Sequence, residues 1–427
     1  MHANTSPEHI CSLPLRVLGR RISPGRLVIT LTSLLVALQA IRATALSVMI
    51  PLPEQNTVQE EYPPLHLDEV QVGNNILQLY RDGRDLYEAI LTAIDGAQES
   101  IYLETSTWEA DEVGTAFKQH LRQKALQGVS VSVIFGGFGH RVTARAFKSL
   151  PPGMHVLEYA PFPRPGHLLD PRRYALDHRK LLVVDGSTAF IGGYNLENLL
   201  VRGWRDTHLQ IRGPAAADVA HAFSAHWNQF SAPPERITRR YPRQFNPWMV
   251  VRANDALRLT FPIRDMYIEA IDRAEHSILL TNASFVPDHS LLAALKAAVI
   301  RGVEVRVLVP WPSNRFLADR LTCSSFTQCL QAGMRLYGYR QTMLRAKTCT
   351  IDGQWSTIGS AHLDLLSSVV NYECNVEVYD AALASQLQDL FADDTAGAVE
   401  VSLACWMNRP WYRKLSERIL APLRILL

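Results

Sequence analysis

One strand–turn–strand motif occurs twice in this chain, and the second copy lacks the histidine of the first. The first copy runs from Asp177-His178-Arg179-Lys180 through Asp185-Gly186 to Gly192-Gly193-Tyr194-Asn195. The second copy runs from Leu344-Arg345-Ala346-Lys347 through Asp352-Gly353 to Gly359-Ser360-Ala361-His362. The same spacing separates the two lysines and the two aspartates, which indicates a duplicated structural unit. At the two mismatched positions, Arg345 replaces His178 and His362 replaces Asn195.

Similarity between the two halves extends beyond the motif. Each half has an apolar strand (Ser100–Thr105 and Ser277–Asn282), an alanine-rich helix ending in glycine, and a second apolar strand (128–134 and 302–308). Strands that alternate with helices of this length are typical of βαβ units in a mostly parallel sheet. We therefore predict an α/β protein of two duplicated units, each a mixed, mostly parallel sheet flanked by helices.

The predicted organisation has five segments. They are an N-terminal segment and linker (1–65), a first unit (66–230), a proline- and arginine-rich connector (231–248), a second unit (249–401) and a basic amphipathic tail (402–427). In the first segment, arginines at 16, 20, 21 and 26 precede an apolar run, and Ala43-Thr44-Ala45 fits a cleavage site. This pattern is typical of a secretory signal. An uncleaved membrane anchor over 27–50 and a start codon placed too far upstream are the alternatives.

Composition limits the classes of function. The formal net charge is only +2, whereas nucleic-acid binding normally needs a strongly basic face, so we predict no nucleic-acid partner. None of the six cysteines forms a CxxC pair, so neither a zinc site nor a disulfide framework is indicated.

The first motif places three phosphate-compatible groups together. Because side chains alternate along a strand, His178 and Lys180 are expected on one face and Arg179 on the other. The Asp185-Gly186 turn brings back a strand that presents Asn195 beside them. An imidazole next to an ammonium and an amide suits attack on a phosphodiester.

An acidic residue follows each motif at the same distance. Asp206 follows His178 by the same number of residues as Glu373 follows Arg345. A carboxylate on the far nitrogen of an imidazole fixes its tautomer, so we predict orienting roles for these two residues.

The duplicated pattern HxKxxxxD followed by GGxN resembles the phospholipase D superfamily over roughly residues 70–400. Four further stretches resemble bacterial cardiolipin synthases: Trp204–His208, Phe285–Asp288, Trp355–Ser360 and Asn371–Glu373. The resemblance implies that the two units pack as a pseudo-dimer, with both motifs in one active site. It also implies a phosphohistidine intermediate and no metal or cofactor.

Carried onto this chain, the resemblance assigns each motif residue a role. His178 is the expected nucleophile, oriented by Asp206, and Glu373 is the orienting residue of the second unit. The expected phosphate ligands are Lys180, Asn195, Lys347 and Arg345. Asp185 and Asp352 count among the catalytic positions and are expected to support the hairpins.

Arg345 stands where the family has a second histidine, which protonates the leaving alkoxide. Arginine keeps its proton at neutral pH, so it binds a phosphoryl oxygen without supplying a proton. Loss of a general acid typically costs about 10²–10⁴-fold in rate. Three hypotheses follow: Arg345 pairs with Glu373 in a silent lipid-binding protein, His362 substitutes as the acid, or water delivers the proton in a slow enzyme.

We predict a phospholipid substrate resembling phosphatidylglycerol, a membrane surface as partner and no obligatory protein partner. A second lipid alcohol as acceptor gives a cardiolipin-type product, whereas water makes the protein a phospholipase. The tail combines Trp406, Trp411 and Tyr412 with basic and apolar residues, which suits a membrane interface or a helix packed on the second unit. The loop 161–167, with Arg172 and Arg173, is expected at the mouth of the site, where it could contact headgroup phosphates; an ordinary solvated loop is the alternative. The predicted location is the bacterial cell membrane, through the N-terminal anchor or peripherally, with export as the alternative.

Overall fold

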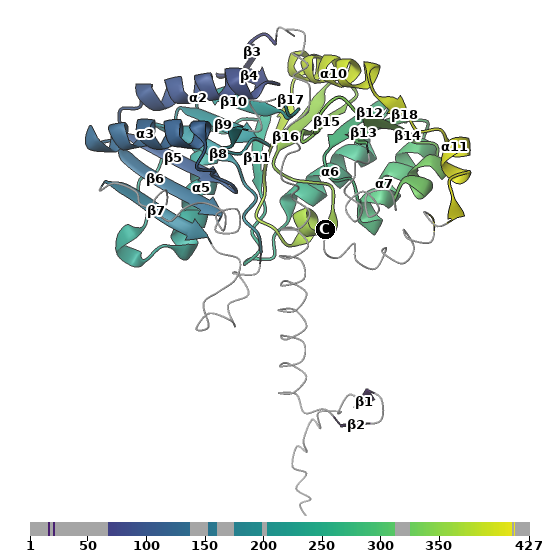
Figure 1. Ribbon diagram of the computed structural model, residues 1–427, viewed down its shortest axis with the longest axis horizontal. Coiled ribbons are helices and arrows are strands. Elements are labelled where there is room, and N and C mark those ends of the chain that lie inside the picture. Colours follow the sequence, from purple (N-terminus) through teal and green to yellow (C-terminus); the bar gives the residue numbers. More distant parts are fainter. Residues whose placement is uncertain are drawn as a thin grey trace, which may run out of the picture. The chain divides into compact units, whose positions relative to one another are not determined.

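The computed structural model describes residues 67–136, 153–159, 175–198, 203–311, 325–411 and 414, together with a short ribbon of Arg16–Val17 (β1) and Arg20–Arg21 (β2) (Figure 1). Residues 55–425 form one compact unit that contains both halves of the repeat. The predicted signal or anchor, the loop 161–167 and the tail beyond Lys414 lie outside the described residues. Within the described ranges, every helix is too short or too polar to cross a bilayer.

The first half is an eight-stranded sheet in the order β3-β4-β10-β9-β8-β5-β6-β7. Its strands are β3 (Val70–Val72), β4 (Asn75–Tyr80), β5 (Ser100–Thr105), β6 (Ser130–Gly136), β7 (Met154–Tyr159), β8 (Leu181–Val184), β9 (Thr188–Gly192) and β10 (His208–Arg212). Its helices are α2 (Gly83–Gly96), α3 (Glu112–Leu126) and α5 (Ala216–Phe230).

The second half repeats this arrangement in the order β11-β17-β16-β15-β12-β13-β14-β18. Its strands are β11 (Met249–Ala253), β12 (Ser277–Asn282), β13 (Glu304–Pro310), β14 (Arg335–Tyr339), β15 (Lys347–Ile351), β16 (Trp355–Gly359), β17 (Cys374–Tyr379) and β18 (Val399–Glu400). Its helices are α6 (Pro262–Arg273), α7 (His289–Ile300), α9 (Leu365–Val369), α10 (Ala381–Ala396) and α11 (Leu403–Met407). Seven strands correspond one to one, which confirms the duplicated α/β fold.

The expectation of mostly parallel sheets is wrong. Only β5-β6-β7 and β12-β13-β14 run parallel, and the remaining neighbours in both sheets are antiparallel. The motif accounts for one antiparallel pair in each sheet, β8-β9 and β15-β16, because two strands joined by a tight turn must run antiparallel.

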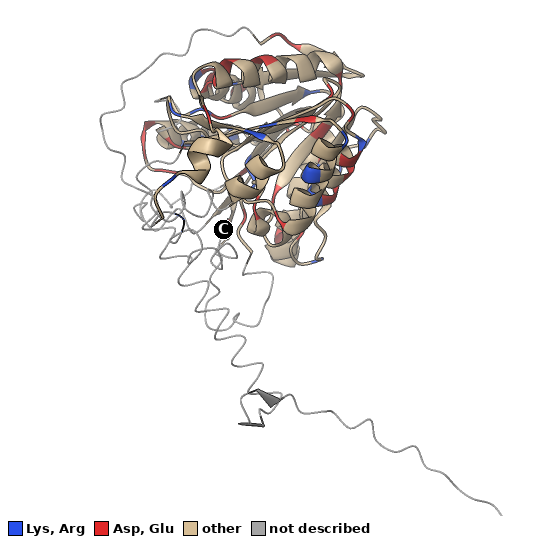
Figure 2. Ribbon diagram, turned by 90° about the vertical axis from the view of Figure 1, so that its right-hand side faces the viewer, with Lys and Arg blue, Asp and Glu red and all other residues tan. Residues whose placement is uncertain are grey.

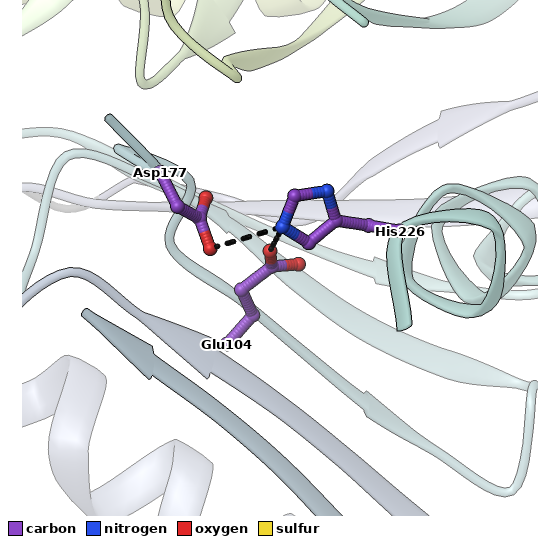
Figure 3. A group of neighbouring side chains, drawn as sticks. All are labelled: Glu104, Asp177 and His226. Carbon is purple, nitrogen blue, oxygen red and sulfur yellow. Dashed lines mark ion pairs between the residues drawn. The ribbon is translucent and has the colours of Figure 1, made fainter. Parts of the chain in front are cut away.

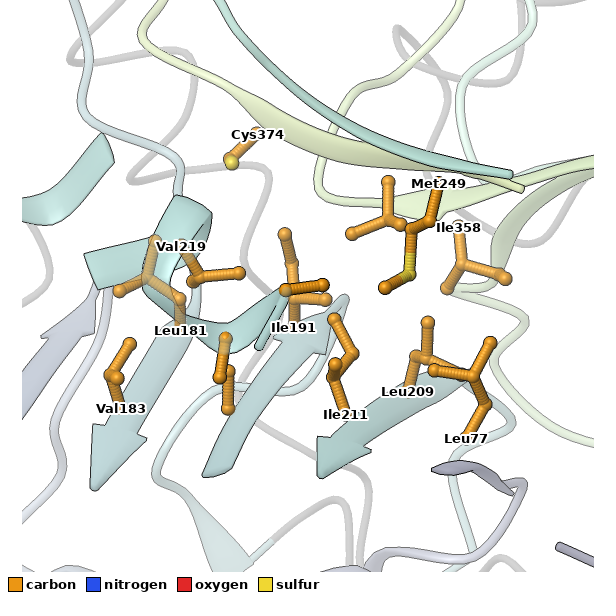
Figure 4. Packing of buried hydrophobic residues seen from close by; sticks show 14 of the residues in the cluster. Leu77, Leu181, Val183, Ile191, Leu209, Ile211, Val219, Met249, Ile358 and Cys374 are labelled. Carbon is orange, nitrogen blue, oxygen red and sulfur yellow. The ribbon is translucent and has the colours of Figure 1, made fainter. Parts of the chain in front are cut away.

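Alternating apolar side chains place a layer on each face of the first sheet. Leu182 and Val184 pack under α2 and α3, whereas Leu181 and Val183 face α5. The α5 face continues into the second half, because the same buried cluster includes Ile358 of β16 and Val376 of β17 (Figure 4). The two sheets therefore share one hydrophobic core, and both hairpins lie at the contact between the halves.

The connector and the tail both pack on the halves that precede them. The connector begins with a 3-10 turn at Pro233–Glu235, and the Trp227 indole of α5 donates to the Glu235 carbonyl at 2.8 Å. In the tail, the Trp406 ring lies 5.3 Å from that of Phe326, and its indole donates to Thr327 at 3.0 Å. The described start of the tail thus packs on the second half, while Leu403 and Met407 of α11 stay exposed.

Candidate active site

Backbone pairing between the halves brings each motif against the acidic segment of the other half. The His178 amide donates to the Tyr372 carbonyl at 3.0 Å, and the Arg345 amide donates to the Arg205 carbonyl at 2.7 Å. Because Glu373 follows Tyr372 and Asp206 follows Arg205, each carboxylate is carried to the motif of the opposite half.

His178 is therefore paired with Glu373. Its Nδ1 lies 3.1 and 3.2 Å from the two Glu373 oxygens, which assigns the proton to Nδ1 and leaves Nε2 with its lone pair. The expectation that Asp206 orients His178 is wrong. Glu373 was expected to serve the motif of the second half, but it pairs with His178 of the first half. Sequence spacing along one half did not show that the partners are exchanged.

The Glu373 carboxylate is fully buried and held by two hydroxyl groups. Ser360 donates to it at 2.5 Å and Ser367 at 2.9 Å. Burial raises the pKa of Glu373 to about 7, although Lys180 and these hydroxyls oppose the shift. Burial also lowers the pKa of His178 well below its usual value, and Lys180 and Lys347 add to this effect, so His178 is neutral at physiological pH.

The two motif lysines occupy equivalent places in the two halves. Lys180 Nζ donates to the His178 carbonyl at 2.5 Å, and Lys347 Nζ donates to the Arg345 carbonyl. Burial lowers the pKa of both lysines, although Glu373 and Asp206 oppose that shift. Two buried lysine side chains beside a neutral imidazole favour an anionic ligand, whose charge would raise the pKa of both lysines toward its usual value.

Arg345 does not pair with Glu373, which contradicts the first hypothesis for its role. Its Nη1 lies 3.5 Å from Glu197 and its Nε lies 4.0 Å from Asp206, and its guanidinium lies over the Trp204 ring at 5.4 Å. The Arg345 side chain is 22 % exposed, so it reaches the open part of the site. Glu197 and Asp206 thus hold Arg345, which occupies the position in the second half that is equivalent to His178 in the first.

Glu197 is a site residue that sequence reasoning missed. Besides pairing with Arg345, it accepts a hydrogen bond from the Asn195 side-chain Nδ2 at 3.1 Å, and the Asn195 side-chain Oδ1 accepts one from the Ser106 hydroxyl at 2.8 Å. Its position two residues beyond Asn195 was the only available signal, and a single charge after a motif has no distinctive pattern.

His362 faces His178 rather than pointing away from it. The two ring centroids lie 5.1 Å apart at an angle of 31°, and His362 Nδ1 has no hydrogen-bond partner among the described residues. Burial lowers the pKa of His362 well below its usual value, with Lys347 as the next largest cause. A neutral imidazole with an unpartnered ring nitrogen therefore lies beside the expected nucleophile.

Asp185 and Asp352 lie at the far end of the hairpins and take no part in the site. Each has a positive φ, 50° and 53°, and each carboxylate accepts three backbone N–H bonds at 2.8 Å. Their expected role in supporting the hairpins matches these contacts, whereas their place among the catalytic residues is wrong.

The glycine at 193 leaves room for Asp206. A Cβ added to Gly193 would lie 2.1 Å from Asp206 Oδ1, whereas the second half has Ser360 at this position, hydrogen-bonded to Glu373. At Gly193, the missing Cβ therefore allows the acidic residue of the same half, Asp206, to approach the backbone closely.

Arg179 points away from the site into a buried charged cluster, as strand alternation predicts. Its guanidinium lies 2.5 Å from Glu104 and 3.4 Å from Asp177, and it also donates to the Ala222 carbonyl of α5 at 3.3 Å. Figure 3 shows Glu104, Asp177 and His226 pointing toward one another, with His226 Nε2 3.5 Å from Asp177. Burial and Arg179 lower the pKa of His226 to about 4, so Arg179 is the cation that neutralises this cluster.

Comparisons with known proteins agree with this geometry. A family model described as "Cardiolipin synthase, PLD-like domain" matches residues 90–227 and 267–395. The chain is 30% identical over 369 residues to the major cardiolipin synthase of Bacillus subtilis (strain 168), covering 82% of this chain and 76% of that protein. It is 28% identical over 367 residues to a cardiolipin synthase of Listeria monocytogenes serotype 4a (strain HCC23), with the same coverage. The fold is similar to a phosphatidylserine synthase of Haemophilus influenzae Rd KW20, with a TM-score of 0.65 at 12% identity over 84% of this chain and 97% of that one.

Proposed function

This chain belongs to the cardiolipin synthase family of phospholipase D-like proteins, and from that premise we propose that it is a phosphatidyltransferase acting through a phosphohistidine on His178. The observation that carries the proposal is the His178–Glu373 pair. It leaves Nε2 of a neutral imidazole free as a nucleophile, and the electrostatics of Lys180 and Lys347 favour an anion beside it.

In the first step, His178 Nε2 attacks the phosphorus of a phosphatidyl donor such as phosphatidylglycerol. A nitrogen–phosphorus bond forms, the bond to the glycerol oxygen breaks, and glycerol leaves. The phosphoryl oxygens carry their largest charge in the transition state. They are neutralised by Lys180, Lys347 and Arg345 and accept a hydrogen bond from Asn195. Ionised Glu373 stabilises the imidazolium that forms as the new bond is made.

His362 is the group that we propose as the proton donor to the leaving glycerol. Its pKa is low in the free protein because it is buried beside Lys347, His178 and Lys180. A bound phosphodiester anion would offset these positive charges and raise that pKa, so that His362 takes up a proton when substrate binds. Besides Lys347, the second half then has one imidazole, His362, and one further phosphate-binding group, Arg345, at positions exchanged relative to the family pattern.

In the second step, the hydroxyl group of a second lipid attacks the phosphohistidine. His362 accepts the hydroxyl proton, the nitrogen–phosphorus bond breaks, and a cardiolipin-type lipid is released. Water in place of the lipid alcohol gives phosphatidic acid, so the acceptor decides between transferase and phospholipase. The membrane surface supplies both lipids, and exposed Leu403 and Met407 beside Arg409 on the tail suit contact with it.

One observation favours a different function. Arg345 is not a proton donor, and it is already held by Glu197 and Asp206. If neither His362 nor water delivers the proton, the site binds phosphodiesters without turnover, as in a silent lipid-binding protein.

The two functions are separated by assaying purified protein in mixed micelles with labelled phosphatidylglycerol. His178→Ala is expected to lose the trapped phosphohistidine and at least about 10⁴-fold of turnover. His362→Ala is expected to lose about 10²–10⁴-fold, because a general acid is removed. His276→Ala is the matched control, because His276 is an exposed histidine of the second half.

Two results would contradict parts of the proposal. Wild-type turnover equal to that of His178→Ala, together with a gain of activity in Arg345→His, would identify a silent protein. Undiminished turnover in His362→Ala would remove its role as the donor and leave the phosphohistidine mechanism intact.

A further inference from the structure

A basic pocket lies between the connector and α5. Its volume is about 580 Å³, which is within the range of small-molecule sites. The floor is one face of α5, at helical spacing, formed by His221, Ser224, Ala225 and Asn228. The wall is the connector from Arg236 to Arg243.

The connector is fixed on both sides of this pocket, so its shape is built into the fold. On one side, Asn228 and Ile237 exchange two hydrogen bonds, at 2.9 and 2.8 Å. On the other side, His221 Nε2 donates to the Tyr241 carbonyl at 2.9 Å, and the Tyr241 hydroxyl bonds to Ser100. The Tyr241 ring also packs directly on Gly186, where an added Cβ would lie 2.2 Å from it.

The lining carries four guanidinium groups and no carboxylate. Arg239 forms an ion pair with Glu99 at 2.9 Å, and Arg243 forms one with Asp218 at 2.5 Å. Neither of these two acidic residues lines the pocket. The guanidinium groups of Arg236 and Arg240 form no ion pair or hydrogen bond with any residue in the described part of the chain, and Arg236 bonds only through its backbone N–H, to Pro233. Basic and acidic residues are otherwise interspersed over the described elements (Figure 2), so a concave surface lined by one sign of charge is unusual for this protein.

The pocket is separate from the site of His178. Tyr241 contacts the Gly186 turn and the start of β5, whereas His178 precedes β8 at the opposite end of the same hairpin. A strand advances about 3.3 Å per residue, so the length of β8 lies between the two sites.

We propose that this pocket binds a phosphate monoester or diester anion at a second site, distinct from the reaction centre. Planar guanidinium groups bind phosphate oxygens with two parallel hydrogen bonds, and the two unpaired ones supply the strongest such donors. The ligand is either a phospholipid headgroup or a soluble phosphate ester. Phe245, two residues beyond Arg243, is 93 % exposed and would add an apolar contact only with a lipid.

Hydrogen exchange of the full-length protein tests the proposal, because its readout is local to the pocket. The probes are glycerol 3-phosphate, pyrophosphate, and vesicles of phosphatidylglycerol or of phosphatidylcholine. Phosphate ligands are expected to protect peptides covering 221–243, and neutral glycerol is expected to leave them unchanged. Arg236→Gln/Arg240→Gln is expected to weaken this binding at least about tenfold, because two charge-assisted contacts are lost.

The control variant is Arg84→Gln/Arg122→Gln, which removes two exposed arginines of α2 and α3 and is expected to bind like wild type. Protection by phosphatidylglycerol vesicles alone, weakened in Phe245→Ser, identifies a lipid headgroup, whereas protection by the soluble probes alone identifies a soluble ester. Absence of protection with every probe, or equal protection in the Arg236→Gln/Arg240→Gln variant, overturns the proposal. Turnover of that variant is expected to match wild type, because the pocket lies apart from His178.

Discussion

The two halves share one fold but surround their motifs differently. Behind the first motif, Arg179 forms ion pairs with buried Glu104 and Asp177. At the equivalent places behind the second motif, Leu344 and Ala346 lie in an apolar cluster with Leu308 and Phe391. A buried acid on α10 of that half, Asp394, forms an ion pair across the interface with Arg205 at 2.8 Å. The first half therefore holds its own motif in place, whereas the second half depends on residues of the first.

The site itself shows a second asymmetry. His178 has its acid, Glu373, at hydrogen-bond distance, whereas Asp206 lies 4.0 Å from Arg345 and shares it with Glu197. The first half supplies the attacking imidazole of His178, and the second half supplies the carboxylate that pairs with it. Separate halves would each lack the partner of their own motif residue.

The largest expected effect is on stability, at the charged cluster of the first half. Arg179→Met leaves Glu104 and Asp177 buried without a cation, which typically costs about 3–5 kcal/mol in the free energy of unfolding. Denaturant unfolding measures this loss. Arg335→Met is the control, because its ion pair with Glu400 is exposed and such pairs contribute about 1 kcal/mol or less.

Adding Glu104→Gln to Arg179→Met should recover part of the lost stability, because it removes one of the two buried acids with which Arg179 pairs. If Arg335→Met and Arg179→Met lost the same free energy of unfolding, the buried cluster of the first half would contribute no more to stability than an exposed ion pair of the second.

The next effect is on turnover and concerns the exchanged acids. Glu373→Gln is expected to lower kcat by about 10²–10⁴-fold, because His178 loses the carboxylate that fixes its tautomer and stabilises the imidazolium. Asp206→Asn is expected to lower kcat by less than about tenfold, since Asp206 contacts Arg345 only at 4.0 Å. A larger loss in Asp206→Asn than in Glu373→Gln would mean that each acid serves the histidine position of its own half.

The smallest effect is the pH dependence of turnover. The pKa of Glu373 is raised to about 7, so the carboxylate form that supports His178 accumulates as pH rises through 7. In wild type, kcat is therefore expected to fall on the acidic side of pH 7. Glu373→Gln, which does not ionise, should show no such limb. An unchanged acidic limb in that variant would assign the titration to another group, with His362 as the next one to test.

Much of the fold followed from the repeat in the sequence. Strand positions such as Ser100–Thr105 and Ser277–Asn282 came from apolar runs and match β5 and β12. Sheet direction was less predictable, because a motif read as strand, turn and strand says that its own two strands are antiparallel but not how they pair with their neighbours. The roles of Glu197, Ser360 and Ser367 were not predicted, because they depend on contacts that the local sequence pattern does not specify.

By itself, the sequence determined the duplicated α/β architecture, the two motifs and the loss of the second histidine, because local spacing and alternation fix which residues share a strand face. Only the tertiary structure decided which acid serves which motif, where Arg345 binds and which way His362 faces. The reason is that backbone pairing between the halves sets these contacts: Tyr372 lies against His178 and Arg205 lies against Arg345. Pairing of that kind joins segments far apart in the chain, and no local pattern specifies it.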